Sequence, residues 1–204
     1  MASIFDPAHA GQPVAGKTAS PLLLSARTFL RHPTMVGSAF PASRWMVERM
    51  LAPVDFRSTR LFVEFGPGTG VFTRAILDRL PARATLLAID TSADFIAHLR
   101  TSLPDPRLRA VNGCAGDIMR LMRDMDLPAA NHILSGLPFS TVGEAEAERI
   151  MAASRAALAP GGQFLAYKMR TAIRPLLERH VGPVRAAYEW RNIPPCHLYL
   201  ARKG

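Results

Sequence analysis

The chain has 204 residues, of which 49% are hydrophobic and 20% charged, and its formal net charge is +9. This composition is typical of a globular domain with a sizeable core, and no run approaches the roughly 20 apolar residues that a transmembrane helix requires. Residues 1–20 lack the basic start and apolar run of a secretory signal, so we expect a cytoplasmic protein. Cys114 and Cys196 lack metal-ligand spacing, which predicts reduced thiols and no metal.

Positive charge is concentrated toward both ends of the sequence. Residues 1–60 hold seven Lys or Arg against three acids, residues 61–167 hold ten against eleven, and residues 168–204 hold eight against two. Two basic ends around a neutral centre fit an ordinary solvated surface. They also fit a protein whose ends face a polyanion, either lipid phosphates or nucleic acid.

Helices are predicted before the first strand. Residues 1–20 are rich in Ala, Gly and Pro, and we expect them to form a flexible segment. Residues 21–32 begin with a proline, a favoured first helical residue, and combine apolar side chains with two arginines, one of them Arg31. That combination suits either an interfacial helix or a helix packed on the core. Residues 41–52 predict a second helix.

From residue 60 onward, strand-like and helix-like segments alternate. Strands are predicted at residues 60–65, 84–89, 107–112, 131–136, 162–168, 183–190 and 196–202. Helices are predicted at residues 69–80, after the N-cap Ser92, and at residues 117–125, 143–158 and 171–181. The alternation predicts an α/β fold of Rossmann-like type. We expect a mostly parallel seven-stranded sheet with helices on both faces and an N-terminal helical extension.

A glycine-rich turn joins the first predicted strand to its helix. Residues 63–70 read Val-Glu-Phe-Gly-Pro-Gly-Thr-Gly, and such glycines let backbone approach a ligand closely. Glu64 stands where dinucleotide enzymes usually have an apolar residue, and an acid there can serve a ligand that carries an amino group. An NAD-dependent enzyme is the rival interpretation. It would usually show Gly-X-Gly-X-X-Gly, whereas Val71 stands three residues after Gly68.

Three further signals fall at the carboxyl ends of the following strands, where ligands bind in such sheets. Asp90 ends the second strand and can accept hydrogen bonds from ribose hydroxyls. Gly116-Asp117-Ile118 follows the third strand, where an adenine can be held, and residues 135–139, Ser-Gly-Leu-Pro-Phe, end the fourth. Alternatively, the acids are structural: Asp117 caps a helix and Glu64 is a buried partner of the turn.

In its order, this set resembles the signature of the class I methyltransferases, which use S-adenosylmethionine (SAM); the resemblance covers roughly residues 60–168. It implies that the glycines pass beneath the methionine part of the cofactor, that Asp90 binds the ribose and that residues 115–118 flank the adenine. The implied cofactor-binding residues are Glu64, Gly66, Gly68, Gly70, Asp90, Thr91, Ala115, Gly116, Asp117, Ile118 and Ser135.

The fourth-strand motif bears on the substrate. N-methyltransferases that act on nucleic acid often carry Asn-Pro-Pro-Tyr or Asn-Leu-Pro-Tyr here, whereas this chain has Ser135 and Phe139 at the Asn and Tyr places. Phe139 keeps an apolar wall but lacks the hydroxyl. The exchange weakens the case for a stacked base without removing it.

Segments 32–46, 135–140 and 191–199 resemble the soluble, membrane-attaching bacterial phosphatidylethanolamine N-methyltransferases, and more distantly the rRNA adenine dimethyltransferases. The resemblance implies methyl transfer from SAM to the amine of phosphatidylethanolamine and of its mono- and dimethylated products, with no metal. The alternative is an rRNA adenine N6-methyltransferase-like enzyme, although the C-terminal helical RNA domain of those enzymes has no counterpart here. A membrane-surface protein that binds the cofactor without transferase activity is a third interpretation.

The lipid resemblance also implies a peripheral enzyme at the inner membrane face, with an anionic membrane and phosphatidylethanolamine as partners and nucleic acid as the less favoured one. Residues 21–52 would contact the membrane and cover the active site, and residues 53–204 would form the SAM-binding domain. The candidate catalytic residues are Ser135 and Gly136, whose carbonyls orient the amine, and Tyr167, which accepts its proton, stacks on the ammonium or is an ordinary strand-end tyrosine. The candidate substrate-binding residues are Arg31, Phe40, Arg44, Trp45, Phe139, Lys168 and Arg191.

Overall fold

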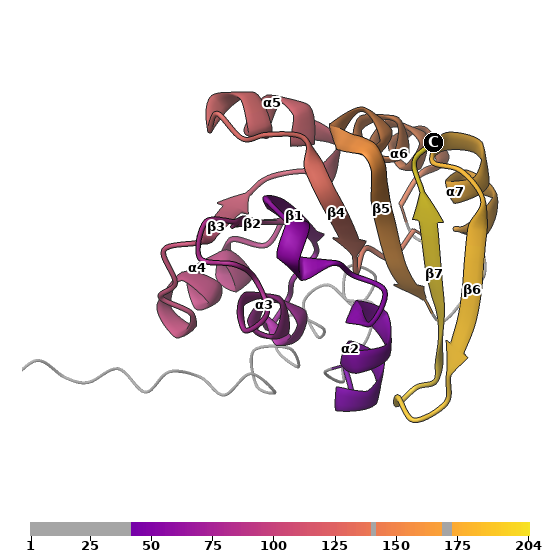
Figure 1. The fold of residues 1–204 in the computed structure, drawn as a ribbon, viewed down its shortest axis with the longest axis horizontal. Coiled ribbons are helices and arrows are strands. Elements are labelled where there is room, and N and C mark those ends of the chain that lie inside the picture. Colours follow the sequence, from indigo (N-terminus) through magenta and orange to yellow (C-terminus); the bar gives the residue numbers. More distant parts are fainter. Residues whose placement is uncertain (1–41, 140–141, 169–172) are drawn as a thin grey trace, which may run out of the picture.

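The computed structural model describes residues 42–139, 142–168 and 173–204. Its centre is a seven-stranded sheet in the order β3-β2-β1-β4-β5-β7-β6 (Figure 1). The strands are β1 (Leu61–Phe65), β2 (Thr85–Asp90), β3 (Leu108–Asn112), β4 (Ala130–Ser135), β5 (Leu158–Lys168), β6 (Val184–Glu189) and β7 (Cys196–Arg202). The first five strands are parallel and β7 is antiparallel to both of its neighbours, which confirms the predicted mostly parallel sheet.

Helices cover both faces of the sheet, as the alternating pattern predicts. The helices are α2 (Arg44–Leu51), α3 (Val71–Leu77), α4 (Ala93–Ser102), α5 (Ile118–Asp124), α6 (Glu144–Ala157) and α7 (Arg174–His180), and the 3-10 turns are η1 (Phe56–Ser58) and η2 (Ala115–Asp117). One hydrophobic cluster joins the sheet to α5, α6 and α7, and a second joins it to α2, α3 and α4. The two layers lie on opposite sides of the strands in Figure 1.

The strand β1 is the centre of the core. Its alternate side chains supply both hydrophobic clusters, because successive residues of a strand point to opposite faces. Leu61, Val63 and Phe65 pack toward one face and Phe62 toward the other, and all four are fully buried. Glu64 is the one charged residue of this strand, and it is buried as well. Burying an ionisable side chain is costly unless it has a partner, so Glu64 indicates a functional position rather than a packing position.

Two predicted boundaries differ from the observed ones. The strand predicted at 162–168 begins earlier, at Leu158, because Gly161 N donates to Lys203 O and Lys203 N donates to Gly162 O. These hydrogen bonds continue the pairing with the chain after β7, and the sheet register shifts at this bulge. The helix predicted over 69–80 is shorter, since Gly70 is its N-cap in a left-handed conformation.

The predicted N-terminal helix at 21–32 lies outside the described residues, as do the candidate residues Arg31 and Phe40. The second predicted helix is α2, which packs beside the β6–β7 hairpin. In the part of the chain that the structure describes, no helix has the length and apolar character needed to traverse a bilayer.

Candidate cofactor and substrate site

The loop after β1 forms a cradle of backbone. Gly66, Gly68 and Gly70 all have positive φ angles, of 65°, 54° and 85°. A side chain at Gly70 is disfavoured for two reasons. Its φ angle is positive, and a Cβ there would lie 2.6 Å from Leu99 Cδ2. At Gly68, in contrast, no described atom lies within 4 Å of the position that a Cβ would take. The loop therefore presents bare backbone to open space, as a binding turn requires.

Glu64 lies beneath this loop and is 3% exposed. Thr73 Oγ1, on α3, donates a 2.7 Å hydrogen bond to Glu64 Oε2. Burial raises the pKa of Glu64 to about 8, and the nearby charge of Asp90 acts in the same direction. No basic side chain pairs with Glu64 among the described residues. A buried acid without a cation suits a ligand that brings its own positive charge.

Asp90 ties the end of β2 to the glycine loop. Its carboxylate accepts hydrogen bonds from Ser92 N at 2.8 Å and from Gly68 N at 3.4 Å. Burial raises its pKa. A carboxylate accepts about four hydrogen bonds, so Asp90 retains capacity for hydroxyl groups of a ligand. Thr91, beside it, is exposed.

Residues 115–118, after β3, match only in part the expectation that they flank an adenine. Asp117 accepts a 2.9 Å hydrogen bond from Arg149 Nη1 of α6, and a Cβ at Gly116 would lie 2.3 Å from the Arg149 guanidinium carbon. Arg149 therefore lies against the surface where an adenine is expected. Ala115 and Ile118 belong to the hydrophobic core, with Ile118 fully buried. Ile118 therefore presents no exposed surface to an adenine, from either its side chain or its backbone.

The ends of β1, β4 and β5 meet at Gly136. Its amide donates to Phe65 O, and a Cβ there would lie 2.9 Å from Gly66 O and 2.6 Å from Tyr167 Oη. Ser135 is fully buried, and its hydroxyl accepts a hydrogen bond from Leu137 N. The structure thus brings the three candidate catalytic residues together beside the cofactor loop.

Tyr167 is half-buried at this junction. Its ring stacks on Phe72 of α3 at 5.0 Å between centroids. Burial raises its pKa above the ordinary tyrosine value, with the charge of Glu64 acting in the same direction. Because a phenolate is disfavoured here, the surroundings of Tyr167 fit the proton-accepting alternative less well than the other two.

Lys168 is half-buried at the end of β5, with its Nζ 5.3 Å from the centroid of the Phe139 ring. Burial lowers the pKa of this lysine to about 7. Phe139 itself is buried and packs with the core, which agrees with the expected apolar wall. A pKa of about 7 leaves Lys168 only partly charged at neutral pH, and its role as a substrate-binding residue stays a prediction.

The remaining described candidates form a second cluster. Arg44 and Arg191 both lie over the ring of Trp45, with their Cζ atoms 3.7 and 5.0 Å from its centroid. Arg191 also pairs with Glu189 at 3.0 Å. This cluster joins the start of α2 to the β6–β7 hairpin rather than to the glycine loop.

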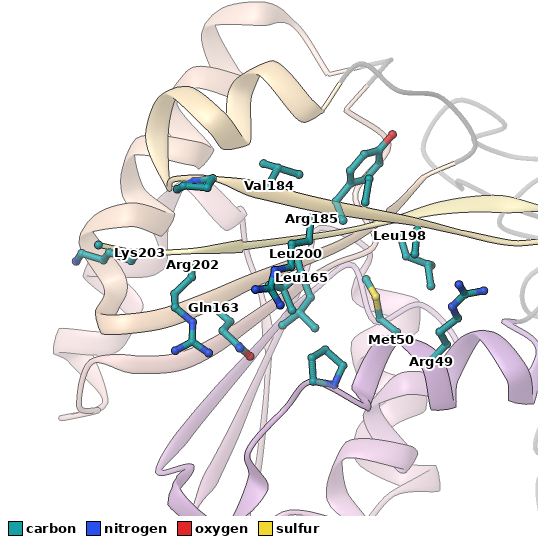
Figure 2. Close-up of a pocket in the computed structure, with 16 residues that line it drawn as sticks. Arg49, Met50, Gln163, Leu165, Val184, Arg185, Leu198, Leu200, Arg202 and Lys203 are labelled. Carbon is teal, nitrogen blue, oxygen red and sulfur yellow. The ribbon is translucent and has the colours of Figure 1, made fainter.

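A groove of about 730 Å³ lies elsewhere on the sheet, over β5, β7 and β6 (Figure 2). Its lining includes Leu165, Leu198 and Leu200, with Arg49 and Arg202 also along it. None of the candidate residues from the sequence lines this groove. It is thus separate from the glycine-loop site.

A general methyltransferase domain family matches residues 62–162, which include the glycine loop, Asp90, Asp117 and the β4 motif. The chain belongs to the class I SAM-dependent methyltransferases. The N-methyltransferase NodS from Bradyrhizobium japonicum, solved with S-adenosyl-L-homocysteine, has the same fold: the TM-score is 0.63 at 14% identity, covering 77% of this chain and 83% of NodS.

Two named relatives differ in their substrates. The ornithine lipid N-methyltransferase of Singulisphaera acidiphila is 26% identical over 176 residues, covering 85% of this chain and 92% of the relative. The ribosomal RNA small subunit methyltransferase A of Thiobacillus denitrificans is 30% identical over 114 residues, but these cover 50% of this chain and 44% of the relative. The chain therefore spans nearly the full length of the lipid enzyme and less than half of the rRNA enzyme.

Sequence reasoning missed two polar residues of this methyltransferase site. Thr73 is the partner of Glu64, and its polar character on the otherwise apolar buried face of α3 is a signal that can be recognised. Arg149 pairs with Asp117 across 32 residues of sequence, and no local pattern indicates that pair.

Proposed function

We propose that this methyltransferase transfers methyl groups from SAM to the amine of a membrane lipid. Phosphatidylethanolamine and its mono- and dimethylated products are the proposed substrates, on the way to phosphatidylcholine, and the amine of an ornithine lipid is the nearest alternative. The main support for this proposal is the similarity to the ornithine lipid N-methyltransferase, which extends over 85% of this chain and 92% of that enzyme. The Ser135 and Phe139 exchanges in the β4 motif support it, because they remove the polar groups expected for a nucleic-acid base.

The residues of the glycine-loop site fit SAM. The backbone of the loop and Asp90 would hold the ribose and methionine parts, and Glu64 would face the positive charge of the ligand. Asp117 would hold the adenine edge, with Arg149 fixing its carboxylate. SAM, when bound, supplies an electrophilic methyl group.

The task of the chain is to align a neutral amine and to keep water away. Deprotonating an amine with a pKa near 10 costs about 4 kcal/mol at pH 7, and alignment contributes several kcal/mol. The carbonyls near Ser135 and Gly136 would accept hydrogen bonds from the amine. Phe139 supplies an apolar wall. Lys168 loses its positive charge as pH rises above 7, so it then does not repel the ammonium of the headgroup.

The proposed place of reaction is the inner face of the membrane. Both ends of the chain are basic, and each basic residue near an anionic bilayer contributes about 1 kcal/mol of attraction. Residues 21–32 are the proposed interfacial helix. Removing residues 1–32 should weaken co-sedimentation with anionic vesicles, and unchanged co-sedimentation would exclude this anchor.

Labelled SAM tests the substrate directly. The chain would be incubated with vesicles that contain phosphatidylethanolamine, with vesicles that contain ornithine lipid, and with rRNA, each with an Asp90→Ala variant as the control for cofactor binding. Label in phosphatidylethanolamine supports the proposal. Label only in ornithine lipid changes the substrate but keeps the lipid class, and label only in rRNA overturns the proposal.

A further inference from the structure

The tip of the β6–β7 hairpin exposes large apolar side chains. Among the described residues, the large hydrophobic side chains that are exposed are Trp45 (38%), Tyr188 (48%), Trp190 (69%) and Ile193 (71%). All four belong to α2 or to the hairpin, although these elements are far apart in the sequence. Exposed apolar side chains that gather in one place mark a contact surface rather than random exposure.

Specific contacts hold these residues as one surface. Ser43 N donates a 2.8 Å hydrogen bond to Asn192 Oδ1, which fixes the start of α2 to the hairpin loop. The Arg191 guanidinium lies between two aromatic rings, with its Cζ 5.0 Å from the centroid of Trp45 and 5.7 Å from that of Trp190. We define the aromatic tip as Trp45, Trp190, Ile193 and the two arginines over Trp45, Arg44 and Arg191.

The aromatic tip lies at the same edge of the sheet as the methyltransferase site. The strand β6 runs parallel to β4 and β5, since β7 is antiparallel to both of its neighbours. The loop after β6 therefore emerges at the edge where β4 ends at Ser135 and β5 at Lys168. In Figure 1 the hairpin reaches beyond the other strands at this edge, with α2 beside it. A flat surface that meets the tip thus faces the site.

We propose that the aromatic tip inserts into the headgroup region of an anionic phospholipid bilayer and holds the active-site edge against it. Tryptophan rings favour this region, because one part of the ring is apolar and its N–H is polar. Isoleucine gains from contact with acyl chains, and Arg44, which has no ion pair among the described residues, supplies attraction to phosphate. The proposal rests on the proposed lipid substrate and adds a docking surface distinct from residues 21–32.

The residues of the tip favour a bilayer over RNA. Single-stranded nucleic acid binds through aromatic stacking and basic grooves, and the most exposed hydrophobic side chain of the tip, Ile193, has no aromatic face. Glu189 also neutralises much of the charge of Arg191. Its carboxylate is buried and accepts a 3.0 Å hydrogen bond from Arg191 Nε. The tip is thus more apolar than cationic.

Tryptophan fluorescence tests the proposal directly, because the chain has 2 tryptophans and both belong to the tip. In a Trp45→Phe variant, Trp190 is the sole tryptophan. Its emission should shift to the blue with phosphatidylglycerol vesicles and be quenched by brominated acyl chains in them. The shift should weaken as salt rises, since screening reduces the attraction of Arg44 to the lipid. Emission that no vesicle changes, or that only RNA changes, overturns the proposal.

Substitutions provide matched controls. The double variant Trp190→Ser/Ile193→Ser should bind anionic vesicles at least about tenfold more weakly, while Trp190→Phe/Ile193→Leu keeps the apolar surface and should keep binding. Arg44→Ala should weaken binding several-fold, whereas Arg83→Ala, an exposed charge before β2 at the opposite edge, should not. Equal binding by the serine and the leucine variants overturns the proposal.

The same samples distinguish a failure of the proposed membrane contact from a failure of the proposed function. If the vesicles shift the emission of Trp190 but no lipid is ever labelled, the proposed function fails and the tip stands as a membrane contact. If lipid in detergent is labelled but Trp190 responds to no vesicle, the function stands and the tip is overturned. Calorimetric SAM binding should be the same in the serine variant and the unaltered chain, which shows that the fold is retained.

Discussion

Thr73 Oγ1 donates a 2.7 Å hydrogen bond to Glu64 Oε2, and the two side chains are 0% and 3% exposed. This hydrogen bond lowers the pKa of Glu64, against the larger effect of burial, which raises it. It thereby favours the charged form of an acid that is proposed to face a cationic ligand. Through this hydrogen bond, Thr73 of α3 would contribute to the proposed binding of the cofactor.

A Thr73→Val variant should therefore bind SAM roughly tenfold more weakly, because the loss of one hydrogen bond to a carboxylate costs about 1.5 kcal/mol or more. Valine keeps the shape of the side chain and removes only the hydroxyl. A Thr73→Ser variant keeps the hydroxyl and should lie close to the unaltered chain. Titration calorimetry measures both, and equal affinities for the valine and serine variants would contradict the assigned role.

The binding of SAM should release a proton from Glu64. Its pKa is about 8 without the ligand, so the acid is mostly protonated at pH 7, and a positive ligand favours its ionisation. Calorimetry at pH 7 in buffers with different ionisation enthalpies should detect this proton. The release should fade above pH 9 and be absent in Glu64→Gln. Proton release that persists in that variant would assign it to another group.

The same carboxyl should make the cofactor-free protein less stable as pH rises. The folded pKa of Glu64 is raised from 4.5 to about 8, so its contribution is complete below pH 4.5 and is lost as pH rises through about 8. Relative to the unaltered chain, Glu64→Gln should gain thermal stability between these values. Melting curves across this range test the sign, and a difference that does not change with pH would refute it.

Lys168 should give the activity an inflection near pH 7. Burial lowers its pKa from 10.5 to about 7, so a positive charge appears beside Phe139 as pH falls below 7 and repels the ammonium of the headgroup. In Lys168→Met, kcat/KM should lose this inflection and keep the rise at higher pH that comes from deprotonation of the amine. Lys168→Arg, which stays charged, should be slow throughout the range. An unchanged profile in the methionine variant would exclude the effect.

The contact between α2 and the hairpin should contribute to stability through Asn192. This side chain is buried, accepts from Ser43 N and donates to Pro194 O at 2.8 Å. Asn192→Ala should lower the free energy of unfolding by about 1 kcal/mol, because it leaves the partly buried Ser43 N and Pro194 O without this partner. Asn192→Asp keeps the acceptor for Ser43 N and should lose less. Urea denaturation measures both, and identical losses would show that the Ser43 contact contributes little.

The sequence predicts the sheet well because its signals are local. Each strand is an apolar run, Ser92 caps α4 as expected, and glycines with positive φ angles follow β1 as the motif requires. The site is predicted only in part, because its electrostatics come from distant neighbours. Nothing near Lys168 in the sequence indicates that burial lowers its pKa. The contact of Asn192 with Ser43 likewise spans 149 residues.

The meeting of Gly136 with the loop after β1 also limits how this enzyme can be redesigned. The Gly136 amide donates to Phe65 O, and a methyl group on Gly136 would lie 2.9 Å from Gly66 O. A change made at Gly136 to accept a different amine will shift the cofactor cradle as well, so such substitutions should be strongly non-additive with those at Gly66. Substitutions in segments remote from this junction should leave the backbone of the cradle unchanged, and they are the better starting point for altering the proposed substrate specificity.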